Sequence, residues 1–113
     1  MTVAELVEKL GLQVRTGQAK LGRAVTGGYA SDLLSDVMGH AREGNLWITL
    51  QAHQNIVAVA GLKELAAIVL VHGREPQEDA VARAEAEGVP ILISALPAYE
   101  LIGRLHAAGV AGQ

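Results

Sequence analysis

LWITLQAHQNIVAVAGLKELAAIVLV, residues 46–71, holds two apolar segments separated by about the length of one helix. Residues 46–50 are apolar, partly β-branched and carry the only Trp, which predicts a strand. Residues 68–71 form an unbroken apolar run, typical of a buried strand in a parallel sheet. Residues 53–62 would suit a strand or a helix, but parallel strands need a crossover, so we predict a helix there.

The same alternation continues toward the carboxyl terminus. Pro76 is predicted to open a helix over residues 76–87, which Gly88 ends. Residues 89–94 predict another buried strand, and Pro97 opens a last helix. We expect that helix to bury Leu101, Ile102 and Leu105. Strand and helix in alternation indicate right-handed crossovers on a parallel sheet.

Before residue 46 the pattern is more mixed. Thr2 and Glu5 form a capping box for a helix over residues 2–10, and Gly11 ends it. Alternating residues predict short extended segments at 12–16 and 24–29, with a loop at 17–22 between them. Ser31 is expected to cap a second helix.

That second helix would carry Asp32 in its first turn, where the helix dipole favours a carboxylate. Leu33, Leu34 and Val37 would then face the core. The Gly- and Ala-rich tail, residues 107–113, is expected to fray. Together these segments predict one three-layer α/β domain over residues 1–113, with a mainly parallel sheet flanked by helices.

Composition excludes several classes of function. The absence of Cys excludes disulfides and thiol catalysis. A net charge of −3 with scattered basic residues argues against nucleic-acid binding. The longest apolar runs, 56–62 and 65–71, fall short of the roughly 20 residues of a membrane span, so we expect a cytoplasmic protein. Charged residues make up 19%, below the roughly 25% of typical domains, which favours a homo-oligomer.

Polar side chains follow the three later strands, at the edge where open parallel sheets bind ligands. Thr49, Gln51, His53 and Asn55 follow the first of these strands. His72 follows the second strand, and Ser94 ends the third. Two roles are open for the segment around His53 and Asn55: capping the next helix, or binding a small anion at that helix N-terminus.

A second candidate segment contains Arg23, Thr26, Gly27 and Gly28. Arg23 could hold an anion, and the two glycines could let the backbone approach a ligand. A tight turn or a close backbone crossing explains the Gly pair equally well. The Lys–Ser/Thr ending of a phosphate-binding loop is missing.

The sequence gives little support to a metal site or to catalysis. His53 and His72 alone are too few ligands for zinc, and the histidine spacing fits no helical zinc motif. No nucleophile elbow is present, so we expect a protein that is not an enzyme and needs no cofactor.

Residues 21–29, LGRAVTGGY, followed by SDLLSDVM at 31–38, resemble the DRTGG domain, as do WITLQ at 47–51 and the segment after it. Arg23, Thr26, Gly27 and Gly28 match the family's namesake residues, whereas Gly22 stands where its Asp would be. The resemblance implies a domain of about this length without a reaction of its own. Such domains accompany CBS domains in some inorganic pyrophosphatases, occur in some phosphotransacetylases, and also stand alone.

Three functions follow as hypotheses. The first is a regulatory module, expected as a homodimer, that binds a small anionic metabolite or an adenine nucleotide. The second is a structural module for dimerisation or for docking to a partner enzyme. The third is an enzyme, and its only support is that such domains occur within or beside enzymes.

Overall fold

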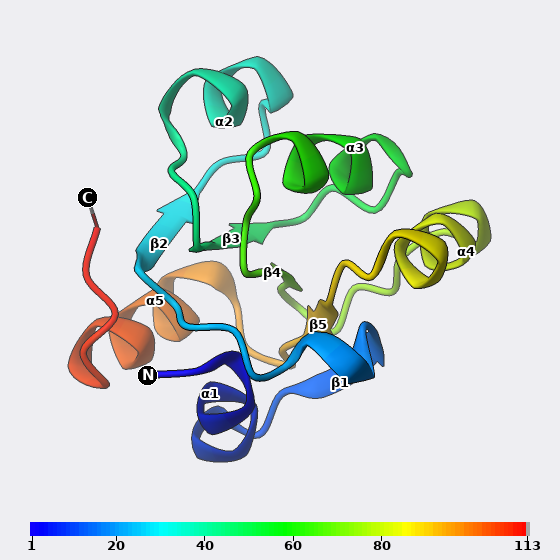
Figure 1. Cartoon of the computed structure of the whole chain (residues 1–113). Helices are drawn as coiled ribbons and strands as arrows, with labels where there is room; N and C mark the ends of the chain where they lie inside the picture. The colour runs from blue at the N-terminus through cyan, green and yellow to red at the C-terminus, as the bar shows by residue number, and fades with distance from the viewer. Residues whose placement is uncertain (113) are drawn as a thin grey trace.

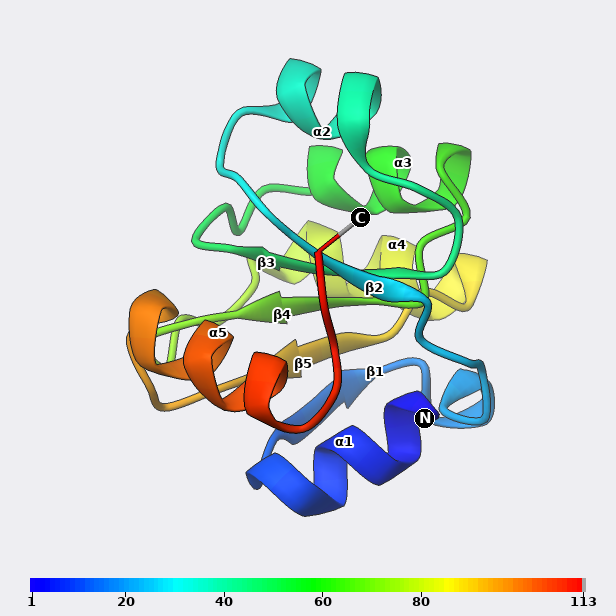
Figure 2. The same cartoon turned by 90° about the vertical axis from the view of Figure 1, so that its left-hand side faces the viewer.

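The computed structural model describes residues 1–112, which form a five-stranded sheet between two layers of helices (Figures 1 and 2). The strand order is β1-β5-β4-β3-β2. Four strands are parallel, and β1 lies antiparallel to β5 at one edge. The predicted three-layer α/β fold is therefore confirmed. The strands are β1 (Gln13–Thr16), β2 (Gly27–Ala30), β3 (Asn45–Thr49), β4 (Ala67–Leu70) and β5 (Ile91–Ile93).

Helices cover both faces of this sheet. Figure 2 shows α2, α3 and α4 on one face and α1 and α5 on the other. The helices are α1 (Val3–Leu10), α2 (Leu34–His40), α3 (Asn55–Leu62), α4 (Glu78–Glu87) and α5 (Ala98–Ala107). None of the helices in residues 1–112 is long and apolar enough to cross a bilayer.

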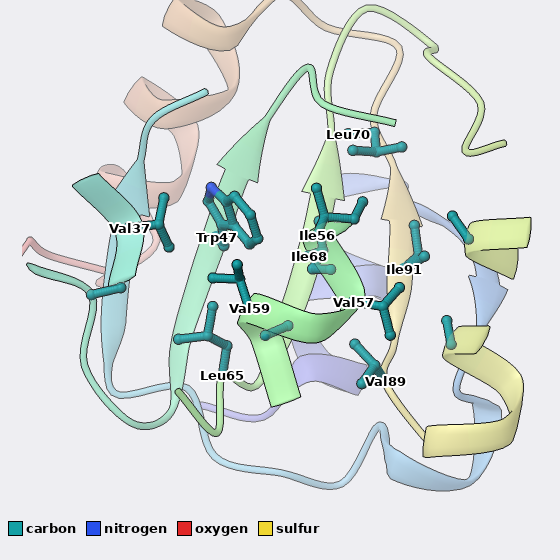
Figure 3. Close-up of a cluster of buried hydrophobic side chains, with 14 of the residues drawn as sticks. Val37, Trp47, Ile56, Val57, Val59, Leu65, Ile68, Leu70, Val89 and Ile91 are labelled. Carbon is teal, nitrogen blue, oxygen red and sulfur yellow. The ribbon is translucent and has the colours of Figure 1, made fainter. Parts of the chain in front are cut away.

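The sheet separates two hydrophobic clusters because successive side chains of a strand point to opposite faces. Trp47 and Ile68 pack under α3 and α4, in the cluster drawn in Figure 3. Their neighbours Leu46, Ile48 and Val69 belong to the cluster under α1 and α5. Burial on both faces explains why the central strands read as unbroken apolar runs in the sequence.

Both predicted ends of α1 are confirmed. The Thr2 hydroxyl accepts the Glu5 N–H, and the Glu5 carboxylate accepts the Thr2 N–H, which completes the capping box. Gly11 ends the helix with φ of 64°, a left-handed conformation that favours glycine. Residues 23–25 then pair with the first residues of the chain, since Val25 N–H donates to the Met1 carbonyl.

The start of α2 differs from the prediction. The helix begins at Leu34, so Ser31 does not cap it and Asp32 is not in its first turn. The Asp32 carboxylate instead accepts hydrogen bonds from the end of β3, at a bend of the chain before the helix. Leu33 is consequently 65% exposed, so its predicted burial is wrong, whereas Val37 is fully buried as expected.

Smaller differences concern the later helices and the tail. The predicted helix at Pro76 begins two residues later, at Glu78, and Ile102 is 38% exposed rather than buried. The tail through residue 112 does not fray: Val110 is buried, and Gly28 N–H donates to the Ala111 carbonyl. Figure 2 shows this segment running beside β2. Residue 113 lies outside the described residues.

Candidate functional site

The two predicted candidate segments lie at opposite ends of the sheet. Gly27 and Gly28 begin β2, and Gly27 pairs with the first residue of β3, Asn45. Thr49 ends β3, next to the last residue of β4, Leu70. The arginine-containing segment therefore belongs to the amino edge of the parallel strands, and the later polar residues to the carboxyl edge.

At the amino edge, Arg23 and Thr26 are bonded to the protein itself. The Arg23 guanidinium donates to the carbonyls of Glu64 and Leu65, at 3.2 and 2.9 Å. The Thr26 hydroxyl donates to the Glu43 carbonyl at 2.8 Å. A hydrogen bond with the Glu64 side chain raises the pKa of the Glu43 carboxyl. Arg23 and Thr26 are therefore engaged within the protein, and a ligand role for residues 23–28 stays a prediction.

The glycine pair has a local structural role as well. Gly27 is buried within β2, and the Gly28 N–H bonds the tail. A side chain at Gly28 would meet a Val110 methyl group at 3.5 Å. The close backbone crossing considered from the sequence is thus present, between β2 and the segment at 110–112.

At the carboxyl edge, the N-cap of α3 is Gln54, which makes no side-chain cap, and the residue before it, His53, supplies two acceptors. Its Nδ1 accepts the Asn55 N–H at 3.1 Å, and its carbonyl accepts the Ile56 N–H at the same distance. The Val57 N–H donates to the Gln54 carbonyl. The first N–H groups of α3 therefore have protein acceptors, and this helix end offers few donors to a ligand.

His72 and Ser94 follow β4 and β5 at the same edge but are held differently. Ser94 is buried, and its hydroxyl accepts the Leu96 N–H at 3.2 Å. His72 is exposed, with φ of 59°, and its N–H donates to the Leu96 carbonyl. Among residues 1–112, no group of three or more His, Asp or Glu side chains could hold a metal ion.

A pocket of about 240 Å³ lies at the carboxyl ends of β2 and β3, and we call it the rim pocket. Of the predicted site residues, Thr49 is the one that lines it. Its walls are mainly apolar, and its polar side chains come from residues 31, 32 and 49. The lining residues are Ala30, Ser31, Asp32, Ile48, Thr49, Leu50, Val71 and Ala98.

Asp32 is tied to the end of β3 by several hydrogen bonds. Its Oδ1 accepts from the Thr49 hydroxyl at 2.7 Å and from the Leu50 N–H at 2.8 Å. Gln51 Nε2 donates to the Asp32 backbone carbonyl at 2.9 Å, and its own N–H donates to the Thr49 hydroxyl oxygen. The predicted residues Thr49 and Gln51 thus position a carboxylate at the pocket.

Ser31, the third polar residue of the pocket, is linked to α2. Hydrogen bonds from the Tyr29 hydroxyl, at 2.7 Å, and then from Ser31 lower the pKa of the Asp36 carboxyl below its usual range. The Ser31 oxygen also accepts the Leu33 N–H at 3.1 Å. These bonds fix the chain between β2 and α2, which forms one side of the pocket.

The opposite side is the start of α5. Pro97 precedes this helix and supplies no side-chain cap, so the first-turn N–H groups lack the usual acceptor. The carboxylate of Glu100 in that turn accepts from Arg104 Nε at 3.2 Å. The rim pocket therefore has a hydrogen-bond acceptor, Asp32, on one side and a helix N-terminus, at Ala98, on the other.

Comparisons with known proteins bear on the fold. No protein-family model and no curated protein matches the chain. Among solved structures, it is similar to the CBS and DRTGG domains of the regulatory region of Clostridium perfringens pyrophosphatase, complexed with the activator diadenosine tetraphosphate. The TM-score is 0.71 at 10% sequence identity, and the match covers 90% of this chain but 44% of that chain. The DRTGG-like fold predicted from the sequence is thereby confirmed.

Proposed function

We propose that this protein is a regulatory module that binds a small anionic metabolite, with an adenine nucleotide as the first candidate. The observation that carries the proposal is the rim pocket, where Asp32 and the uncapped N-terminus of α5 line one apolar cavity. The structurally similar pyrophosphatase region is itself described as regulatory and as bound to an adenine dinucleotide activator.

The chemistry of the pocket favours binding over catalysis. Its apolar walls can pack a base or a sugar, and N–H groups at a helix N-terminus suit a phosphate or carboxylate. The Thr49 hydroxyl donates to Asp32 Oδ1 and accepts the Gln51 N–H, which gives it a role in positioning the carboxylate. The volume of the rim pocket, about 240 Å³, is below the roughly 300–1,000 Å³ of typical ligand sites. The pocket would therefore enclose one part of a nucleotide rather than the whole molecule.

A thermal-shift panel of nucleotides and phosphorylated metabolites tests this function. A ligand at a hundred times its dissociation constant should stabilise the wild type by about 2.7 kcal/mol. Ala30→Leu places a larger side chain in the pocket wall and should abolish the shift, whereas Ala82→Leu, on the exposed surface of α4, should keep it. Equal shifts in both variants would place binding elsewhere, and no shift in the wild type would contradict the proposal.

We also propose that the protein is a homodimer whose second subunit covers this rim. Two exposed hydrophobic residues directly follow lining residues in the sequence: Tyr99, 92% exposed, follows Ala98, and Leu33 follows Asp32. Leu50 is itself part of the lining and is partly exposed. An exposed apolar patch of this kind marks an interaction surface.

Sedimentation velocity at micromolar concentrations should show a dimer that Tyr99→Glu converts to a monomer. Leu62→Glu, which changes another exposed apolar residue at the end of α3, should leave the dimer intact. A wild-type monomer would contradict the homodimer. A dimer that responds to no compound of the panel would favour the alternative, a structural module for dimerisation or for docking to a partner enzyme.

A further inference from the structure

The segments that connect strands and helices differ in charge between the two edges of the sheet. At the carboxyl edge, residues 31–33, 50–54, 71–77 and 94–97 carry Asp32, Arg74 and Glu75 as their charged residues. Glu75 is neutralised, because its carboxylate pairs with Arg15 at 2.6 Å. At the amino edge, residues 17–26, 41–44, 63–66 and 88–90 carry Lys20, Arg23, Arg42, Glu43, Lys63 and Glu64. A surface with few charges is typical of the core of a protein interface.

The two remaining charges at the carboxyl edge are opposite in sign, and neither has a charged partner within the chain. Asp32 and Arg74 are both exposed. The Asp32 carboxylate accepts hydrogen bonds from Thr49 and Leu50 but forms no ion pair among residues 1–112. The Arg74 side chain makes no hydrogen bond or ion pair in the same part of the chain. A surface with one charge of each sign can face a copy of itself without net repulsion.

The order of the strands relates these two charges by symmetry. Asp32 lies at the ends of β2 and β3, since it follows β2 and is bonded to the end of β3. Arg74 lies at the ends of β4 and β5, since it follows β4 and the Gly73 N–H donates to the Ser94 carbonyl at 2.7 Å. These four strands are neighbours in the order β5-β4-β3-β2. A two-fold axis that passes between β3 and β4, perpendicular to the sheet, therefore places Asp32 of one copy against Arg74 of the other, twice.

We propose that two copies of the chain meet carboxyl edge to carboxyl edge, with Asp32 of each copy paired to Arg74 of the other. This inference rests on the homodimer proposed above and adds the contact that fixes the orientation of its subunits. Leu50, which is 38% exposed, follows the last residue of β3 and lies beside the proposed axis. Because Asp32 and Leu50 both line the rim pocket, the two rim pockets would open toward each other across the axis.

Sedimentation equilibrium of the full chain tests this pairing by charge reversal. Arg74→Glu sets like charges against each other at both symmetric contacts and should weaken self-association about 10- to 100-fold. Asp32→Lys should weaken self-association in the same way. An equimolar mixture of the two variants should form a dimer about as tightly as wild-type protein, since each variant supplies the charge that the other has lost.

Arg42→Glu is the matched control, because it makes the same charge reversal at an exposed residue of the opposite edge and should leave self-association unchanged. Asp32→Lys also removes the bonds to the end of β3, so circular dichroism checks its fold, and Arg74→Glu carries the test alone if that variant does not fold. A dimer of Arg74→Glu as tight as wild type, or two folded variants that do not dimerise together, would overturn the inference and leave the homodimer standing. A monomeric wild type would contradict both.

Discussion

Replacing Thr16 by Val should destabilise the protein far more than its small change in shape suggests. Thr16 is fully buried at the end of the edge strand β1, where the register with β5 shifts. Its hydroxyl donates to the Val89 carbonyl at 2.7 Å and accepts the Ile91 N–H at 2.9 Å. The Thr16 hydroxyl therefore satisfies one backbone carbonyl and one backbone N–H at the point where the strand register is irregular.

The magnitude follows from the two groups left behind. A buried donor or acceptor without a partner costs about 1–3 kcal/mol, so the pair should cost about 2–6 kcal/mol. Val keeps the shape of Thr and leaves no cavity, so we expect about 3 kcal/mol. With an unfolding entropy of about 2.1 cal/mol/K per residue, the melting temperature should fall by roughly 12 °C.

Urea denaturation followed by circular dichroism and Trp47 fluorescence measures this loss. Thr16→Ser is the control: it keeps the hydroxyl, loses one methyl group and should cost about 1 kcal/mol. The slope of the unfolding free energy with urea should not change between variants, since the folded structure is retained. If Thr16→Val proved as stable as Thr16→Ser, the hydrogen-bonding account of this strand edge would be refuted.

Three further predictions concern other parts of the chain. Tyr29→Phe removes the hydroxyl that chiefly lowers the pKa of Asp36. The stabilisation from this bond is fully present above the pKa of Asp in the unfolded chain, about 3.9, and is lost as pH falls through the lower folded-state pKa. The free energies of unfolding of wild type and variant, measured as a function of pH, should therefore converge at low pH. Arg23→Ala removes bonds to two carbonyls and should lower the free energy of unfolding by about 1 kcal/mol without changing nucleotide affinity in calorimetry; a large loss of affinity would restore the ligand role predicted for that segment. Deleting residues 110–113 removes a buried Val and should cost about 2 kcal/mol, and hydrogen exchange at the Gly28 amide should accelerate; unchanged exchange would contradict the pairing of the tail with β2.

The sequence predicted the central strands well because their residues are buried on both faces. The runs at 46–50 and 68–71 contain enough apolar residues to identify β3 and β4 without long-range information. The antiparallel pairing of β1 with β5 could not be predicted in this way, since its register depends on residues such as Thr16 and Val89 that are far apart in the chain. Local sequence patterns do not indicate which distant residues will form such contacts.

The candidate site shows the same division. The carboxyl edge and Thr49 follow from strand direction, which the alternation of strands and helices indicates. Asp32 was missed as a pocket residue because a carboxylate after Ser31 also suits the first turn of a helix, and the bonds to the end of β3 decide otherwise. Ala98 carries no chemical signal at all; the packing of α5 brings it to the pocket.

An amide chemical-shift map of isotope-labelled protein, titrated with ATP, tests the site most directly. We predict saturable shifts concentrated on Asp32, Thr49, Leu50 and Ala98, from three segments that meet at the rim pocket. Shifts confined to residues 23–28, at the other end of the sheet, or an unchanged spectrum at millimolar ATP would contradict the account.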